Sequence, residues 1–580
     1  MTRTRYFLAI PHKAAADTAL GYAKAQLRSA DMAAIACRRD LLIMVDDTTA
    51  CSTPSERHWL IGDIFGKGDI RLDGLACDVE ASARTCLGKL LSKFWGAYIC
   101  VAQGTAPDSY CVLRDPSGAV PAYWTLANGM VMMSSDLDLL IKAGSPRPSV
   151  DWNGLAHFLI SPDARPAATC LKGISELRRG EMLTVSPADL HVENLWSPWD
   201  HVEPRLSWAE AQDAIRQSIM KVVKHLTQGQ GRFLLGLSGG LDSSIVAAAL
   251  SASGADFSAL TLATPDPAGD ERAWAAIVAD HLSIRLDEAI IDASRIDLTR
   301  SHADHLPRPV SRPLRQEIDR LSQEQADAQG AQAHIGGAGG DSVFCHFSSA
   351  TALTDRLLIG GARSGSWSSL NDLVGLTGVS HGRVIRQALA CLPRSRRHVS
   401  SKRNLHMLSP ALSDHPLPPC HPWLMAPTSA LPGKWRHIRE LVAIENHMDA
   451  LRCASDRPHL APLMTQPVLE AALRVPTWLW CEGGLNRSAA RHAFADMLPA
   501  EIIYRRSKGA PDSVSARAFE MGRAVLYESL IGGQLDQAGL LDRSQITACL
   551  SQPSPLRDHG YLRLLFLANV EAWVTHWQAR

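Results

Sequence analysis

The sequence predicts an α/β protein with two differently built parts. Up to about residue 200, short strand-like runs recur between turn residues, which is typical of a β-rich, sandwich-like domain with a few helices. From Ser207 onward, buried strand-like runs alternate with helical patterns, which indicates a parallel sheet with crossover helices. From about Thr351 the pattern is mainly helical.

Length and composition bound the class of protein. A chain of 580 residues is long enough for more than one domain, and its 46% hydrophobic and 20% charged residues are ordinary for a globular protein. Lys+Arg and Asp+Glu balance at 59 each, so no overall charge favours nucleic acid or a membrane surface as partner. The 13 cysteines are scattered without a CxxC motif, and no apolar run approaches the ~18 residues of a membrane helix. We therefore expect a cytoplasmic protein that binds neither nucleic acid nor membrane.

The strands of the first part are expected where apolar residues cluster between turn signals, with a helix at 137–144. The expected strand-like runs are 5–10, 41–47, 58–65, 96–103, 109–115, 129–136 and 181–186. Residues 193–208 are rich in Trp and Pro without periodicity and are interpreted as a linker. This places the domain boundary between residues 1–203 and 204–580.

The second part begins with a helical pattern over 207–226, where Ser207 is the expected N-cap and Glu210 completes a capping box. Residues 232–237 then read as a buried strand, and 241–253 as a helix that Gly254 ends. The alternation continues with a strand at 257–265, a helix at 270–282 and a strand at 285–291.

The loop Ser238-Gly239-Gly240, between that strand and helix, is suited to an anion. Glycine lets the backbone approach a ligand closely, and a helix start presents unpaired N–H groups and a favourable dipole. Ser243 and Ser244 add hydroxyl groups. Neither the kinase-type P-loop GxxxxGK[ST] nor GxGxxG is present here.

Asp242 would be repelled by a polyphosphate unless a cation lay between them, and Mg²⁺ is commonly held by one or two carboxylates plus phosphate oxygens. A second loop of this kind exists at 336–341, where Asp341 follows four glycines after a short predicted strand. We expect Asp242 and Asp341 to hold Mg²⁺ together. The alternative is that the two glycine-rich turns only close tight strand–helix connections.

These motifs resemble a known family. The run SGGLDS at 238–243 is similar to the SGGxDS pyrophosphate loop of ATP-pyrophosphatase enzymes, and the whole chain resembles the asparagine synthetase family. Residues 112–124, with Arg114, Asp115 and Gly118, resemble that family's N-terminal RDxxGxxPLY segment, and 498–512 resemble its late LPxxIxxRxK segment. The resemblance implies an Ntn-hydrolase-like glutaminase domain, followed by a synthetase domain of the PP-loop (adenine nucleotide alpha-hydrolase-like) type with helical extensions.

The same resemblance implies the site. Lys508 would be the catalytic lysine, stabilising charge on the adenylate and on the tetrahedral species that follows. Asp242 and Asp341 would hold Mg²⁺. The implied ATP-binding residues are Leu237, Ser238, Gly239, Gly240, Asp242, Ser243, Ser244, Thr261, Gly336 and Gly337.

The sequence departs from asparagine synthetases at two places. Their glutaminase needs an N-terminal cysteine, whereas this chain begins Met1-Thr2 and carries Ile61-Gly62-Asp63 in place of the Asn-Gly-Glu glutamine-binding segment. We therefore expect an inactive glutaminase-like domain. In the second loop, Ala338 stands where asparagine synthetases have Glu and β-lactam synthetases have a catalytic Tyr, so no general base is assigned.

With these departures the chain most resembles lasso-peptide cyclases, most specifically over 458–513. That resemblance implies ATP-Mg²⁺-dependent adenylation of an Asp or Glu side chain in a core peptide, followed by attack of the peptide's own N-terminal amine. A leader peptidase would be a partner protein. The alternatives are an ammonia-dependent asparagine synthetase or β-lactam synthetase-like cyclase, and a non-catalytic nucleotide-binding scaffold. The basic stretch 381–403 either binds a peptide or partner, or is a solvated loop.

Overall fold

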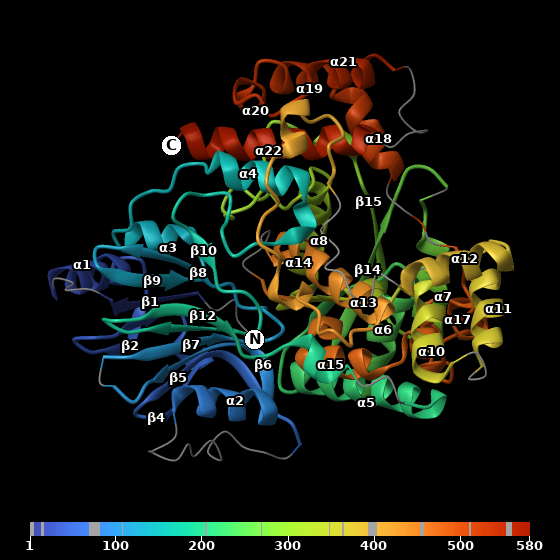
Figure 1. The fold of residues 1–580 in the computed structure, drawn as a ribbon, viewed down its shortest axis with the longest axis horizontal. Helices are drawn as coiled ribbons and strands as arrows, with labels where there is room; N and C mark the ends of the chain where they lie inside the picture. The colour runs from blue at the N-terminus through green and yellow to red at the C-terminus, as the bar shows by residue number, and fades with distance from the viewer. Residues whose placement is uncertain are drawn as a thin grey trace.

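The computed structural model is a mixed α/β structure with three sheets (Figure 1). It describes residues 5–12, 17–68, 82–106, 108–202, 206–267, 269–346, 349–361, 365–392, 403–452, 457–507, 509, 512–552 and 560–579.

The N-terminal part consists of two six-stranded antiparallel sheets, drawn in blue to teal in Figure 1. The first has the order β10-β8-β9-β1-β3-β2 and the second β12-β11-β7-β6-β5-β4. The strands of the first sheet are β1 (Tyr6–Pro11), β2 (Ala33–Cys37), β3 (Leu42–Val45), β8 (Tyr123–Ala127), β9 (Met130–Ser134) and β10 (Ser175–Glu176). Those of the second are β4 (Cys51–Ser55), β5 (His58–Gly66), β6 (Phe94–Gln103), β7 (Tyr110–Arg114), β11 (Glu181–Val185) and β12 (Leu190–Asn194).

The alternation of side chains along the strands builds the core between these sheets. In β1, Tyr6, Leu8 and Ile10 belong to the apolar cluster that contains residues of both sheets, whereas Phe7 and Ala9 belong to a cluster on the opposite face. Helices cover the outer faces: α1 (Asp17–Arg28), α2 (Ala83–Lys93), α3 (Leu137–Lys142) and α4 (Trp152–Ile160). The sandwich predicted for this part is therefore present.

The third sheet is parallel, with the order β15-β14-β13-β16-β17. Its strands are β13 (Phe233–Gly236), β14 (Phe257–Ala263), β15 (Leu286–Ile290), β16 (Ala333–Gly336) and β17 (His459–Leu460). The crossover helices are α6 (Leu241–Ser253), α7 (Arg272–Leu282) and α8 (Arg315–Gln329). Helix α5 (Trp208–Thr227) begins with the predicted Ser207–Glu210 capping box, and α6 ends at Gly254, whose φ of 68° suits glycine.

Helices make up most of the remaining chain, as expected from residue 351 onward. Figure 1 shows α10, α11 and α12 grouped together at one side, and α18–α22 gathered near the C-terminus. These helices are α9 (Gly340–Val343), α10 (Thr351–Gly360), α11 (Ser366–Thr377), α12 (His381–Cys391), α13 (Pro432–Ala443), α14 (Glu445–Arg452), α15 (Gln466–Arg474), α16 (Ser488–Ala493), α17 (Ala500–Ile503), α18 (Asp512–Met521), α19 (Arg523–Leu530), α20 (Gln534–Gln537), α21 (Arg543–Ser551) and α22 (Gly560–Ala579).

Two segments that the sequence suggested to be a loop and a linker have a different structure. Residues 381–391 of the basic stretch form helix α12, because Val384 and Ala388, one helical turn apart, are buried; its residues 393–402 lie outside the described ranges. The Trp-rich connection is packed against the second part: Trp196 is buried, and the indole Nε1 of Trp199 donates to the carbonyl of Trp423 at 2.8 Å. Among the helices that the structure describes, none is long and apolar enough to cross a membrane.

Candidate active site

The two glycine-rich loops leave neighbouring strands at the same edge of the parallel sheet. Strands β13 and β16 pair in parallel, and Gly236 at the end of one lies opposite Gly336 at the end of the other. The loop at 238–240 and the loop at 337–341 therefore start side by side. The carboxyl edge of such a sheet is where open α/β folds bind their ligands.

Three glycines allow close packing around the loops: Gly239 against helix α7, and Gly337 and Gly340 against the first loop and the start of α6. Gly239 has φ of 64°, and a Cβ there would meet the backbone of Trp274. A Cβ on Gly337 would lie 2.5 Å from the backbone nitrogen of Ser243, and one on Gly340 would meet the carboxyl group of Asp242. Only glycine therefore lets the second loop lie directly against Asp242.

The serine hydroxyls form hydrogen bonds within the first loop and the start of α6. Gly240 is the N-cap of α6, and its carbonyl accepts hydrogen bonds from the hydroxyls of Ser244 at 2.8 Å and Ser243 at 3.2 Å. Ser238 Oγ lies 3.4 Å from Ser243 Oγ. The helix start is thereby fixed with its N-terminus at the sheet edge, where a helix attracts anions.

Arg487, which precedes α16, lies between the two aspartates. Its Nη1 is 3.0 Å from both carboxyl oxygens of Asp242 and 2.6 Å from Oδ1 of Asp341. One nitrogen thus reaches both carboxylates, so Asp242 and Asp341 are close enough to share a single cation. Two carboxylates that share a cation beside an anion-binding loop fit Mg²⁺, which completes its shell with phosphate oxygens and water. Among the described residues, no group of three or more His, Cys, Asp or Glu side chains could hold a metal without such added ligands.

A cavity of about 500 Å³ opens over these loops. Its charged lining comprises four arginines (Arg315, Arg487, Arg491 and Arg505) and two aspartates (Asp242 and Asp341), a formal excess of two positive charges. Arg505 is held in place by hydrogen bonds to the carbonyl of Gly239 at 3.1 Å and to Glu271 at 2.7 Å. Burial, together with the neighbouring Arg487, lowers the pKa of Arg491 to about 10, so it remains charged at neutral pH. The cavity therefore favours a polyanion.

The predicted site residues divide into three groups. Ser238, Gly240, Asp242, Ser243, Gly337 and Asp341 line the cavity. Gly336 lines a neighbouring cavity of about 150 Å³, which shares Gly236, Arg315 and Ala338 with the first. Four others are not among the lining residues of either cavity: Leu237, Gly239, Ser244 and Thr261. Of these, Thr261 is buried on β14, and the described residues give its hydroxyl no hydrogen-bond partner.

Lys508 lies outside the described residues. Its two neighbours are described. Ser507 lines the cavity, and the backbone nitrogen of Gly509 donates to Glu271 at 3.0 Å. The chain on both sides of position 508 is therefore tied to the same region as the two loops.

Sequence reasoning missed the arginines and His447, which also lines the cavity. Arg487 and Arg491 lie within a segment, 486–513, already singled out by its resemblance. Arg487 is the N-cap of α16, with φ of 54°, and Arg491 lies within that helix. The available signal was therefore their place in this segment and not a shared helix face.

Comparison with models of known protein families gives two matches. The model of the family described as asparagine synthase matches residues 214–575. The chain belongs to the asparagine synthase family. A second model, described as a glutamine amidotransferase domain, matches residues 80–196. The family assignment supports an ATP-dependent, amide-forming carbon–nitrogen ligase, and members of this family generally use ATP with Mg²⁺.

Solved structures give a weaker likeness. The allosteric regulatory enzyme of purine biosynthesis is 10% identical, with a TM-score of 0.22 over 49% of this chain and 80% of that one. A glutamine phosphoribosylpyrophosphate amidotransferase from B. subtilis is 11% identical, with a TM-score of 0.22 over 49% of this chain and 65% of that one. No curated protein matches the sequence.

Proposed function

We propose that this member of the asparagine synthase family is a lasso-peptide macrolactam synthetase. It adenylates an Asp or Glu side chain of a core peptide with ATP, releasing pyrophosphate. The N-terminal amine of the same peptide then attacks the acyl-adenylate, giving an isopeptide-bonded ring and AMP.

The observation that carries this proposal is Ala338. It lines both adjoining cavities, and in sequence it lies between Gly336, at the end of its strand, and Asp341. Asparagine synthetases and β-lactam synthetases carry Glu or Tyr at the corresponding position, and a methyl group can neither donate nor accept a proton. A substrate that brings its own amine, in a site widened at this position, fits such a change better than free ammonia.

The chain's own residues would act mainly through charge and position. Mg²⁺, held by Asp242 and Asp341, would neutralise phosphate charge. Arg487, Arg491 and Arg505 would bind the phosphates from the cavity wall, and the N-terminus of α6 would face the pyrophosphate formed. By the family resemblance, Lys508 would stabilise the adenylate and the tetrahedral species.

The amine and the activated carboxyl belong to one peptide, so their reaction is intramolecular. Holding them together removes much of the entropic cost of a bimolecular step, on the order of 7–11 kcal/mol in well-oriented cases. The enzyme's task is then to bind a folded peptide. A leader peptidase that delivers the core peptide in the cytoplasm is the partner we propose.

The test is to incubate the protein with ATP, Mg²⁺ and synthetic peptides that place Asp or Glu at different distances from a free N-terminal amine. We expect AMP, pyrophosphate and a peptide product lighter by one water. AMP formation with aspartate and ammonia alone would favour an asparagine synthetase. A lack of turnover with every acceptor would favour a nucleotide-binding scaffold.

A further inference from the structure

Helix α14 connects the N-terminal part of the chain with the cavity. Its Glu445, Asn446 and Asp449 bind residues of the first part. His447, between them in sequence, and Ile444, which precedes the helix, line the cavity. One short helix therefore binds the N-terminal part through its carboxylates and amide and contributes His447 to the cavity wall.

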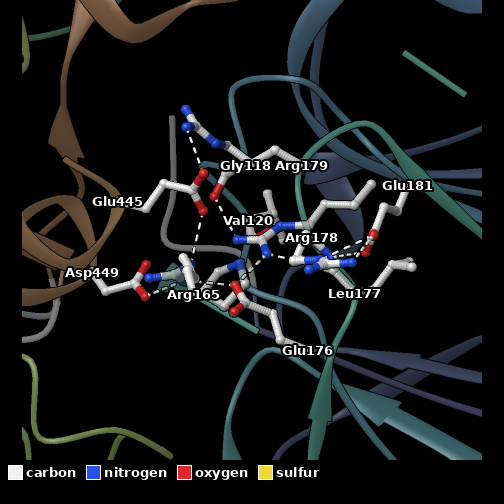
Figure 2. A network of polar contacts seen from close by, with 12 residues as sticks. Gly118, Val120, Arg165, Glu176, Leu177, Arg178, Arg179, Glu181, Glu445 and Asp449 are labelled. Atoms are coloured by element: carbon white, nitrogen blue, oxygen red, sulfur yellow. Dashed lines mark hydrogen bonds and ion pairs between the residues drawn. The ribbon is translucent and has the colours of Figure 1, made fainter. Parts of the chain in front are cut away.

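The face toward the N-terminal part is held by buried ion pairs (Figure 2). Arg165 lies 2.8 Å from Glu445 and 2.5 Å from Asp449, and its Nη1 donates to Asn446 at 3.0 Å. Arg179 donates to Glu445 at 2.7 Å. The side chains of Arg165, Glu445 and Asp449 are 1%, 4% and 8% exposed, so these contacts are nearly free of competition from water.

A central carboxylate joins this cluster to the sheets. Glu176 of β10 pairs with Arg165 at 2.6 Å, with Arg114 of β7 at 2.8 Å and with Arg308 at 2.6 Å. Burial alone would raise the pKa of Glu176, but the three arginines outweigh it and hold that pKa well below its usual range. The cluster stays ionised and ties α14 to both sheets of the N-terminal part.

His447 is the one histidine among the described residues that line the larger cavity. Its side chain is exposed there, and no hydrogen-bond partner for either ring nitrogen is found among the described residues. Part of the residue is accessible to solvent, but desolvation by the surrounding protein, followed by the charges of Arg315 and Arg312, lowers the pKa of His447 to about 4. The ring is therefore neutral at physiological pH and has a nitrogen lone pair to offer.

Among the described residues, the carboxylates that line the cavity and the histidines near it already have partners. Asp242 and Asp341 bind Arg487, and His346 outside it lies 3.4 Å from Asp341. His437, which is buried and is not among the lining residues, is bonded to the carbonyl of Val343 at 2.9 Å. The arginines are cations and cannot accept a proton.

From this geometry we infer that His447 is the general base for the attacking amine, in place of the side chain missing at Ala338. This inference rests on the proposed function. The amine nitrogen attacks the carbonyl carbon of the acyl-adenylate and forms the new C–N bond. The proton leaves that nitrogen for His447, and the C–O bond to the phosphate breaks, with its electron pair departing on AMP.

ATP binding strengthens this base at the right time. Arg315 and Arg312 depress the basicity of His447 in the empty cavity, and phosphate groups bring negative charge to the same walls. That charge raises the affinity of His447 for a proton toward its ordinary value, near the pH at which a general base works best. Proton acceptance is thereby coupled to the presence of the nucleotide.

The experiment separates adenylation from amine attack. ATP–pyrophosphate exchange with a synthetic substrate peptide reports the first step, and mass spectrometry of the ring product reports both. Hydroxylamine, a strong nucleophile that is uncharged at neutral pH, traps the acyl-adenylate as a hydroxamate without a strong base. The variants are His447→Gln and His447→Ala, with His281→Gln, an exposed histidine of α7, as matched control.

We expect His447→Gln to keep exchange and hydroxamate formation within about threefold, and to lose ring formation by about 100-fold or more, the usual contribution of a general base. Added imidazole should partly restore ring formation in His447→Ala. If His447→Gln forms the ring at the wild-type rate, or loses exchange and ring formation equally, His447 is not the general base. If the wild-type protein itself forms neither pyrophosphate, hydroxamate nor ring with any peptide, the proposed function is wrong and the role of His447 falls with it.

Discussion

Arg165 and Asp449, which are 284 residues apart in sequence, form a 2.5 Å hydrogen-bonded ion pair that is almost wholly excluded from solvent. The pair joins a loop of the N-terminal part to helix α14. The glutaminase-like part therefore has a structural role in the synthetase site, whatever chemistry it retains. It fixes the helix that carries His447.

Replacing Arg165 should destabilise the protein strongly. Arg165→Met leaves Glu445 and Asp449 buried with fewer partners, and breaking a buried pair from one side costs about 3–5 kcal/mol. We expect a marked fall in the urea midpoint of unfolding, followed by circular dichroism. Ring formation should fall more than ATP–pyrophosphate exchange, because α14 loses its support.

The control is an exposed ion pair of the same part. Arg84 lies 3.0 Å from Glu193, with side chains 62% and 30% exposed. Arg84→Met should change the stability by less than about 1 kcal/mol, as exposed pairs usually do. Equal midpoints for the two variants would show that the Arg165 cluster does not stabilise the fold.

A second prediction concerns pH and Asp355 of α10. Burial raises the pKa of this carboxyl to about 7, against the hydrogen bonds from Gly433 N and Thr477 Oγ1. Because the folded-state pKa lies above the unfolded value of 3.8, folding favours the protonated form. The stability that Asp355 contributes is complete below about pH 4 and is lost as the pH rises toward 7.

Asp355→Asn should remove that dependence. Between pH 5 and pH 7 the wild type should lose about 2–3 kcal/mol relative to the variant, at 1.36 kcal/mol per pKa unit. Urea titrations of both proteins at several pH values measure the difference. Asp213→Asn, at an exposed position of α5, should run parallel to the wild type. A difference between wild type and Asp355→Asn that is constant with pH would contradict the assignment.

The sequence was informative wherever the determinants are local. The capping box of α5 needs only Ser207 and Glu210, three residues apart, and the end of α6 needs only Gly254; both were predicted and both are present. The two Gly-Asp loops were found because glycine and aspartate cluster within a few residues. Since both loops follow predicted strands, their proximity followed from the parallel sheet.

What could not be predicted depends on contacts between distant segments. Arg487 contacts Asp242, which is 245 residues away in sequence. An arginine seen only in a sequence is most often a surface residue. The Arg165 cluster is hidden for the same reason, because burial of a charge leaves no mark on its neighbours in the chain. The position of His447 at the cavity wall depends on how α14 packs, which no local pattern in the sequence specifies.

A third prediction concerns the glycine-rich loop at 336–341. In Gly337→Ala the new Cβ would lie 2.5 Å from Ser243 N and 2.6 Å from Asp242 C, so one of the two loops must move. We expect the KM for ATP to rise about tenfold or more in pyrophosphate exchange. A Cβ on the adjacent Gly336 meets nothing within 4 Å, and Gly336→Ala should lose far less. The same KM for both variants would show that the contact between the loops is unimportant for ATP.

The last prediction concerns the cation that Asp242 and Asp341 share. Without nucleotide, the guanidinium of Arg487 occupies the space between them and competes with a divalent ion. A neighbouring unit charge at ~4 Å is worth about 1 kcal/mol in water and up to about 4 near a protein surface. Arg487→Gln should therefore bind Mn²⁺ about tenfold more tightly than the wild type in the absence of ATP, as measured by electron paramagnetic resonance of the free ion.

The same variant should bind ATP more weakly, because the phosphates lose a cationic partner. Arg216→Gln, which alters an exposed pair with Asp496, should match the wild type in both measurements, and adding Asp341→Asn to Arg487→Gln should abolish the gain. Mn²⁺ affinity that does not rise in Arg487→Gln would mean that the two carboxylates do not form a shared metal site.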